Sequence, residues 1–404
     1  MRRTYYKLDM KLKSPLSLGS GANDNTDGDV LLDSRGNPFI PATSLAGVIR
    51  HSLDEETAKK LFGSIGDDGH ASPVIVYDAD CIGKSTVSVR DSVKLTDKVA
   101  EDMLKFDFEA VETGAEFVGY IELVDCGEDD DKTILEAIEK INLGLLRFGY
   151  KTSRGYGTVK ITKCLKTVFD NIDNWLDFDM FDDAQWESAE EMKLCSEVGT
   201  VKITLSLKQR GALSIRSYAT EPSVGNDSAP DYVQLSLRDG TPVIPGTSWA
   251  GAFRERFTEF TDKDTCKKLF GYIEKNKKNA ANKKSAIYFD ESMILNAEPK
   301  IITRNSIDRY TCGTNDGALY TEKTVYNGST ELNILITEKQ SCETYSALMA
   351  VIADLDNGLL SIGGLSSVGR GLFTVEKLLV NEKDKTEALK SYNFAEITEV
   401  LANV

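Results

Sequence analysis

The chain contains an internal repeat, and this duplication limits the possible fold more than any other feature of the sequence. Ile40–Arg50 reads IPATSLAGVIR, and Ile244–Arg254 reads IPGTSWAGAFR. Lys59–Ile65 likewise recurs as Lys267–Ile273, both beginning with KKLFG. Self-similarity of this kind is typical of a structural unit that has been copied. The sequence therefore predicts two copies of one domain.

Further landmarks extend the match to the second half of each copy. Arg90 and Arg304 begin the matching segments RDSV and RNSI, and the same offset of 214 residues links Gly144 to Gly358. The predicted segments are a first domain at 1–165, an acidic linker at 166–198, and a second domain with an added C-terminal helix at 199–404.

Apolar periodicity predicts the same order of elements in each copy. Alternating apolar residues indicate a first strand near 6–12 in copy one, and Thr43 or Ser44 is expected to cap a helix that runs toward Leu61. Extended stretches near 72–90 and 115–124, a second helix and a last strand follow. The apolar face of that second helix is predicted to contain Ile134, Ile138, Ile141 and Leu145, with Leu348, Ile352, Leu355 and Leu359 as counterparts.

This order of strand, helix, two strands, helix and strand predicts an α+β fold. It is the order of ferredoxin-like domains, which are also the architecture of RNA-recognition modules. The expected molecule is thus two tandem ferredoxin-like domains with inserted loops. Because a fold alone does not define an activity, candidate sites must support any function.

Composition excludes several other classes of protein. No apolar stretch is long enough to cross a membrane, and the N-terminal residues lack the apolar core of a signal peptide. We therefore expect a cytoplasmic protein without a membrane partner. The 7 Cys residues form no C-x-x-C pair, which argues against a disulfide framework and a zinc site.

The net charge of −16 is unusual for a nucleic-acid-binding protein, but the charge is unevenly distributed. Asp170–Met192 contains nine Asp or Glu and no Lys or Arg, whereas Lys267–Lys284 contains seven Lys and one Glu. Local charge therefore decides where RNA could bind.

The aromatic residues of the acidic linker are expected to pack on the protein's own domains rather than on a partner. These residues are Trp175, Phe178, Phe181 and Trp186.

A glycine-rich turn near the end of each copy is a candidate phosphate-binding site. Its sequence is GYKTSRGYG at 149–157 and GGLSSVGRG at 363–371. Glycines let backbone N–H groups approach a phosphate, and a guanidinium can bind it through two hydrogen bonds. Aligning the turns by their arginines makes Arg154 equivalent to Arg370 and the turn of copy one shorter. A tight turn with a surface arginine is the alternative. The predicted contacts are Arg154, Gly155, Arg370 and Gly371.

The motif P-x-T-S-x-A-G-x-x-R is a second candidate. A capped helix with a glycine in its first turns exposes N–H groups, which form a natural anion site. The alternative is a capped helix whose glycine allows close packing on the sheet. The predicted RNA contacts are Ser44, Gly47 and Arg50 in copy one and Ser248, Gly251 and Arg254 in copy two.

An acid-rich loop precedes that helix in both copies. Asp27 and Asp231 coincide in register, each fourteen residues before the proline of the motif, Pro41 or Pro245. A carboxylate beside bound RNA can coordinate a divalent cation or orient a ribose 2′-hydroxyl for attack on its own phosphodiester. A solvated polar loop is the alternative.

The ordered set of these motifs resembles the RAMP superfamily of CRISPR-associated proteins, and in particular the tandem backbone subunits of type III effector complexes of the III-D-like kind. The resemblance implies binding to a CRISPR guide RNA, to target RNA and to other effector subunits. It also implies that Asp27 and Asp231 are catalytic and hold Mg²⁺ or Mn²⁺. The product of target-RNA cleavage would be a 2′,3′-cyclic phosphate. Arg90 and Arg304 complete the predicted RNA-binding set.

The chain departs from the family pattern at several positions. Ala46 and Ala250 stand where relatives often carry Lys, and copy one lacks a counterpart of the segment that begins at Asp308. Unequal RNA binding or cleavage by the two copies is therefore an alternative. A guide-RNA scaffold without catalysis is another. A guide-processing nuclease would need a histidine, and neither His51 nor His70 recurs in copy two.

Overall fold

The chain separates into two compact units in the computed structural model. Unit 1 comprises Met1–Val89, Phe106–Thr152 and Tyr156–Val198, and unit 2 comprises Arg90–Lys105, Ser153–Gly155 and Gly199–Val404. Both units are α+β, with a mainly antiparallel sheet and helices. The structure describes residues 1–21, 26–66, 69–96, 99–195, 199–217, 230–272 and 282–402.

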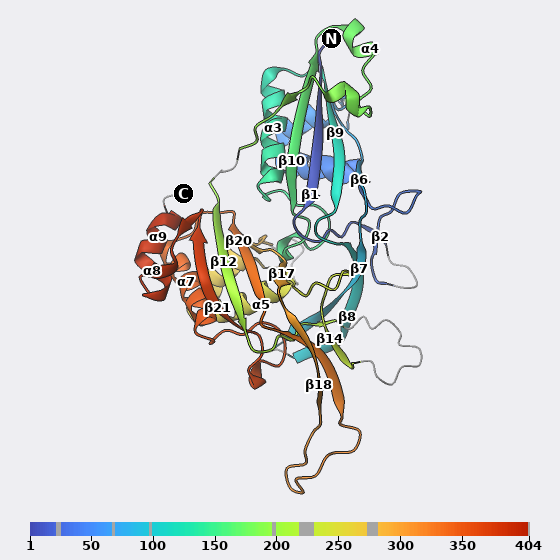
Figure 1. Ribbon diagram of the computed structural model, residues 1–404. Coiled ribbons are helices and arrows are strands. Elements are labelled where there is room, and N and C mark those ends of the chain that lie inside the picture. The colour runs from blue at the N-terminus through green and yellow to red at the C-terminus, as the bar shows by residue number, and fades with distance from the viewer. Residues whose placement is uncertain are drawn as a thin grey trace. The chain divides into compact units, whose positions relative to one another are not determined.

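The main sheet of unit 1 is built around its first strand (Figure 1). β1 (Arg3–Leu12) pairs antiparallel with β10 (Val159–Phe169) on one side and with β9 (Glu116–Val124) on the other. The remaining strands are short. They are β4 (Phe39–Ile40), β5 (Val74–Val76), β6 (Ala79–Ile82) and β11 (Glu190–Glu191), in the sheet order β11-β10-β1-β9-β6-β4 with β5 paired to β9.

The main sheet of unit 2 repeats this arrangement. β12 (Val201–Arg210) lies between β20 (Ser329–Ile336) and β21 (Leu372–Val380), antiparallel to both. The other members are β15 (Val243–Ile244), β16 (Ile287–Phe289), β17 (Ser292–Leu295) and β22 (Lys383–Asp384). The central strand of each sheet is the first strand of its copy, so the predicted duplication is visible in the pairing.

The helix predicted to run toward Leu61 is broken into two. α1 (Ala42–His51) ends before Ser52, and α2 (Glu55–Phe62) begins at a new N-cap, where the Asp54 side chain accepts from the backbone N–H groups of Glu56 and Thr57. Unit 2 has the same break between α5 (Gly246–Phe257) and α6 (Lys263–Phe270).

Thr43 and Ser44 do not cap α1, contrary to the sequence-based expectation. The N-cap is Pro41, with no side-chain hydrogen bond, and the two residues lie inside the first turn. Pro245 has the same role before α5. Each helix therefore begins two or three residues earlier than predicted, after a proline whose ring fixes the backbone angle but offers no side-chain acceptor.

The long helices match the predicted offset. α3 (Glu128–Asn142) and α7 (Cys342–Asp356) have ends exactly 214 residues apart. Leu145 and Leu359 lie beyond these helices, and Leu359 is 64% exposed, so the predicted apolar face is shorter than expected. No helix in the described ranges has both the length and the apolar character needed to cross a bilayer.

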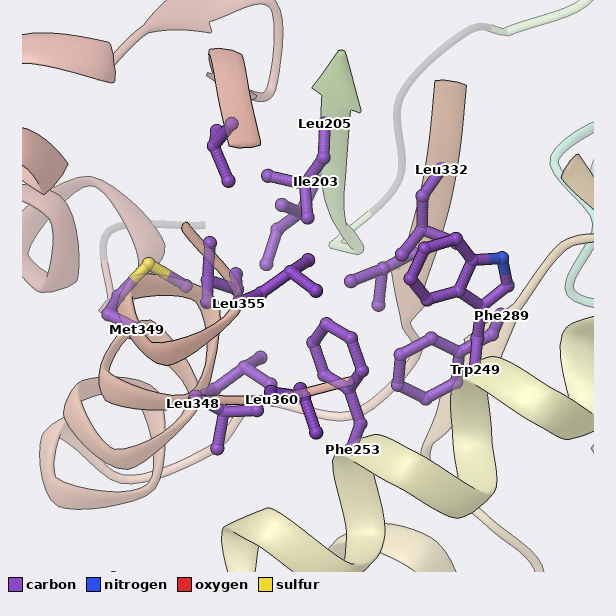
Figure 2. Close-up of a cluster of buried hydrophobic side chains, with 14 of the residues drawn as sticks. Ile203, Leu205, Trp249, Phe253, Phe289, Leu332, Leu348, Met349, Leu355 and Leu360 are labelled. Carbon is purple, nitrogen blue, oxygen red and sulfur yellow. The ribbon is translucent and has the colours of Figure 1, made fainter. Parts of the chain in front are cut away.

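The core of unit 2 lies between the helices and one face of the sheet. Figure 2 shows Trp249 and Phe253 of α5 facing side chains of α7 such as Leu348, with Ile203 of β12 completing the cluster. Trp249, Phe253 and Ile203 are fully buried. Burial of large apolar side chains on this scale is the main force that holds an α-on-β layer together.

Further strands that the sequence analysis missed lie outside the main sheets. β7 (Val87–Thr96) pairs with β8 (Val99–Val111), and β2 (Gly19–Gly21) pairs with β3 (Asp29–Val30). Unit 2 contains a four-stranded sheet in the order β13-β14-β19-β18. Its members are β13 (Arg216–Ser217), β14 (Tyr232–Gln234), β19 (Tyr320–Tyr326) and β18 (Glu298–Arg304).

The linker packs on its own unit, as the sequence predicted. Trp186 is 3% exposed and clusters with Tyr5, Tyr120 and Leu165 of the main sheet. The segment contains α4 (Ile172–Leu176), and its predicted start after residue 165 falls inside β10. The added C-terminal segment of unit 2 forms α8 (Thr386–Lys390) and α9 (Phe394–Ala402).

Candidate nucleic-acid interface

Asp27 and Asp231 occupy equivalent, exposed positions. Each lies just before a short strand, and each carboxylate accepts one backbone N–H through its Oδ2 atom. The donor is Asp107, at 3.1 Å, in unit 1 and Thr321, at 2.6 Å, in unit 2. These donors are themselves 214 residues apart, so the two units hold the two carboxylates in the same way. The loop residues 22–25 and 218–229, which precede them, lie outside the described residues.

The two positions differ in charge. The Asp27 backbone N–H donates to Oδ1 of Asp107 at 3.1 Å, which brings a second carboxylate to this point of unit 1. Unit 2 has Thr321 at the position of Asp107 and therefore lacks this second charge. The sequence analysis missed Asp107, because its partner is eighty residues away in the chain and no local motif marks it.

The exposed carboxylates fit one mode of metal binding. Magnesium is usually bound through one or two carboxylates together with substrate phosphates, and it keeps several waters. Asp27 with Asp107, or Asp231 alone, offers that kind of ligand. In the part of the chain that the structure describes, no group of three or more His, Cys, Asp or Glu side chains is placed to hold a metal.

Gly47 and Gly251 lie on the exposed face of α1 and α5. A Cβ atom added to either residue would meet nothing within 4 Å. The alternative that these glycines allow close packing on the sheet is therefore wrong. An exposed glycine inside a helix costs about 1 kcal/mol relative to alanine. Because both units keep it without a packing reason, a ligand that approaches the helix backbone closely is the favoured explanation.

Arg50 and Arg254 lie three residues after these glycines and are exposed on the same helix face. In unit 1 this face opens into a groove between α1 and α2 with a volume of about 580 Å³. The groove is lined by Gly47, Arg50, His51, Leu53, Glu55, Ala58 and Lys59. In unit 2, burial raises the pKa of the Cys266 thiol on α6, and a hydrogen bond from Arg254 opposes that shift.

The start of α1 is not an open anion site, contrary to the sequence-based hypothesis. The N–H of Ala42, the first residue of α1, donates to Oδ1 of Asp78 at 2.6 Å, so a protein carboxylate already occupies this end. The N–H groups of Ser44 and Ser248 donate to the carbonyl oxygens of Pro41 and Pro245, both at 2.9 Å. The two serines are half-buried members of the first turn, and nothing in the structure presents their N–H groups to a ligand.

The glycine-rich turns have equal length, which corrects their alignment. Gly157 and Gly371 have positive φ angles of 76° and 73°, and a Cβ at either would lie 1.8 Å from the Phe148 oxygen or 1.9 Å from the Ile362 oxygen. These two glycines are therefore the same structural position. Arg154 then corresponds to Val368, and Arg370 corresponds to Tyr156, so matching the arginines was wrong.

Arg370 is not available to RNA in this structure. It is 2% exposed and forms an ion pair with Glu322, which is also 2% exposed. Arg90, which belongs to unit 2, is 2% exposed as well and pairs with Glu291 at 3.3 Å. Both arginines were predicted to bind RNA, but each guanidinium is buried against a protein carboxylate.

The other predicted contacts in and near the turns differ in their environment. Arg154 is exposed and Arg304 is half-exposed, so both remain candidates for RNA binding. Gly155 is buried, and a Cβ there would lie 2.2 Å from the Phe289 oxygen, within unit 2. Gly155 and Gly371 are therefore explained by packing, because any side chain at either position would clash with a backbone oxygen of the protein.

Comparison with protein families identifies the repeat. The model of the RAMP superfamily matches residues 9–160 and 200–374, one region in each copy. A comparison with the curated proteins finds no match. The two matched regions cover most of the chain and contain both glycine-bearing helices and both loop aspartates. The chain carries two RAMP regions in tandem. It belongs to the RAMP superfamily, and this membership suggests that it is a CRISPR-associated RNA-binding subunit.

Proposed function

We propose that this protein is a guide-RNA-binding backbone subunit of a type III CRISPR effector complex, of the III-D-like tandem kind, and that it cleaves guide-paired target RNA at two points. Each unit would be one ferredoxin-like domain with one cleavage point. The observation that carries the proposal is the equivalence of Asp27 and Asp231, which are exposed and held by the same backbone position.

The grip on RNA comes from the exposed faces of α1 and α5. Gly47 and Gly251 allow a phosphate to approach the helix backbone, and Arg50 and Arg254 provide the positive charge. Contacts of this kind carry no sequence information. Sequence would instead be read by base pairing between guide and target RNA.

The geometry of each aspartate supports the chemistry proposed for it. Its Oδ2 is held by a backbone N–H, which fixes the carboxylate and leaves Oδ1 to orient the ribose 2′-hydroxyl. The 2′-oxygen attacks the adjacent phosphorus, the bond to the 5′-oxygen breaks, and the hydroxyl proton ends on that 5′-oxygen. The products are a 2′,3′-cyclic phosphate and a 5′-hydroxyl. A bound Mg²⁺ or Mn²⁺ would neutralise charge on the phosphate oxygens.

The decisive experiment replaces each aspartate in the assembled complex. Asp27→Asn and Asp231→Asn should each slow one cut in target RNA by about 10² or more, while the other cut continues. Asparagine retains an oxygen that can accept the backbone N–H, so the loop is expected to keep its shape. Rates are measured from end-labelled target RNA on denaturing gels.

Asp33→Asn and Asp239→Asn are matched controls, because both residues are loop aspartates that accept backbone N–H groups. They should leave both cuts unchanged. If Asp27→Asn and Asp231→Asn also leave both cuts at wild-type rates, the catalytic assignment fails.

A scaffold without catalysis is the second candidate. It is favoured by the hydrogen bonds between Asp27 and Asp107, which could serve only to shape the loop. A scaffold binds RNA in a salt-sensitive manner. It yields the same absence of product whether complementary RNA is incubated with Mg²⁺, Mn²⁺ or chelator.

A further inference from the structure

Unit 2 carries a cation and two aromatic rings beside Asp231, a group that we call the tyrosine platform (Arg216, Tyr232 and Tyr320). The Arg216 guanidinium carbon lies 3.9 Å from the centre of the Tyr232 ring. The Tyr232 and Tyr320 rings are edge to face, with centres 6.1 Å apart and planes at 74°. All three side chains are half-exposed.

The platform is held at a fixed place relative to the candidate catalytic carboxylate. Tyr232 directly follows Asp231, and Tyr320 directly precedes Thr321, whose N–H donates to Asp231. β13 supplies Arg216 and pairs with β14, and β14 pairs in parallel with β19. The same strand pairing therefore sets the position of both rings and of the carboxylate.

Unit 1 has a different group at this place. The Lys151 ammonium lies 4.4 Å from the centre of the Phe106 ring and 3.2 Å from that of Phe108, and Lys151 is buried. Gly28 follows Asp27, and Phe106 precedes Asp107. Gly19 pairs with Val30 as Arg216 pairs with Gln234, so glycine also replaces the cation. The two units thus present the same carboxylate next to very different surfaces.

The platform has the chemistry of a nucleotide-binding surface rather than of a core cluster. Neither tyrosine belongs to the buried apolar core of unit 2. Nε of Arg216 is buried and has no hydrogen-bond partner among the residues that the structure describes. The Arg216 side chain as a whole is half-exposed, so the rest of its guanidinium is available to a phosphate or base oxygen. Aromatic faces with an adjacent arginine are a common means of binding unpaired bases.

We infer that Arg216, Tyr232 and Tyr320 form a base-stacking subsite that binds one unpaired nucleotide of RNA next to Asp231. The inference rests on the proposed RNA binding but not on cleavage. The stacked base would orient the adjoining ribose toward the carboxylate of unit 2.

The test uses the full-length chain and a uridine-rich single-stranded RNA in which one 2-aminopurine is moved along the strand, with chelator present throughout. Stacking on an aromatic ring quenches the fluorescence of this base. We expect quenching at one position with the wild-type chain and with Tyr232→Phe. Tyr232→Leu should abolish it and weaken RNA binding about fivefold or more.

Two further variants separate the subsite from general damage to the fold. Tyr320→Leu and Arg216→Gln should each reduce the quenching, whereas Phe106→Leu, the counterpart of Tyr320 in unit 1, should leave it unchanged. Circular dichroism checks that each variant is folded. Quenching that persists in folded Tyr232→Leu and Tyr320→Leu, or its absence at every position with the wild-type chain, overturns the inference.

The outcome is independent of the cleavage proposal. Asp231→Asn should keep the quenching, because the ring positions depend on strand pairing and not on the charge of the carboxylate. Quenching without metal-dependent cleavage would support the subsite and reject the nuclease. Cleavage by the assembled complex without quenching would do the opposite.

Discussion

Two buried residue pairs at the same positions use opposite chemistry. Phe108 and Tyr156 of unit 1 are in ring contact, with centres 5.8 Å apart. At an offset of 214, unit 2 has Glu322 and Arg370, which form an ion pair with both members 2% exposed. Both pairs connect the glycine-rich turn to the strand whose N–H donates to the candidate catalytic aspartate, β8 in unit 1 and β19 in unit 2. A buried ion pair is destabilising when one partner is lost, but it can often be replaced as a whole by apolar residues.

Loss of one partner of this ion pair should destabilise unit 2. Arg370→Tyr alone should lower the free energy of unfolding of unit 2 by about 3–5 kcal/mol, because it leaves the Glu322 charge buried without a partner. Adding Glu322→Phe recreates the pair of unit 1 and should recover most of that loss. Denaturant unfolding of the single and double variants measures the non-additivity.

RNA affinity is the control for this double variant. If Arg370 served RNA instead of Glu322, the folded double variant would bind RNA more weakly than the wild-type chain. Simple addition of the two single effects on stability would show that the residues are not coupled.

At the scale of elements, α1 and α5 each contain a glycine, which lowers helix stability, and an exposed arginine. A Cβ at Gly47 or Gly251 would meet no atom of the described residues within 4 Å, and the arginine one turn later is exposed in both units. The linker shows the contrasting case of an element explained by packing. Its Trp186 indole N–H donates to the Met180 oxygen at 2.8 Å, and its rings cover Tyr5 and Tyr120. The linker thus needs no partner to account for its aromatic residues.

The helix glycines lead to two effects of opposite sign. Gly47→Ala and Gly251→Ala should each raise the free energy of unfolding by up to about 1 kcal/mol, since alanine favours the helix and the added methyl group meets open space. Both should weaken RNA binding, because the methyl group blocks close approach to the helix backbone. Thermal unfolding and filter binding measure the two effects. A stabilised variant with wild-type RNA affinity would contradict the assignment.

At the scale of the whole molecule, the net charge of −16 opposes RNA binding, so any affinity must come from local groups of positive charge. The exposed arginines of α1 and α5 are such groups. The carboxylates of the linker are held on unit 1 by packing of its aromatic rings. Binding should accordingly be strong at low salt and fall steeply as salt rises.

The salt dependence gives a measurement for each arginine. Arg50→Gln and Arg254→Gln should each reduce the slope of log affinity against log salt by about 0.7–1, the value for one phosphate contact. Arg35→Gln, at an exposed loop position of unit 1, is the control and should leave the slope unchanged. Equal slopes for all three variants would exclude phosphate contacts at α1 and α5.

The sequence by itself determined the duplication, the order of the main elements and the register of Asp27 with Asp231. These features follow from local patterns and from spacing along the chain, and both can be read without knowing which distant residues are in contact. It also indicated that Arg50 and Arg254 lie inside a helix, because both follow the same helix-start motif.

Only the tertiary structure decided which predicted arginines are exposed. Arg370 and Arg90 are buried because carboxylates far away in the chain reach them, and no motif records that distance. The same reason hid Asp107 and the platform of Arg216, Tyr232 and Tyr320, whose members come from separate strands. Side-chain environment is set by which strands pair and which layers pack, and this information is spread over the whole fold.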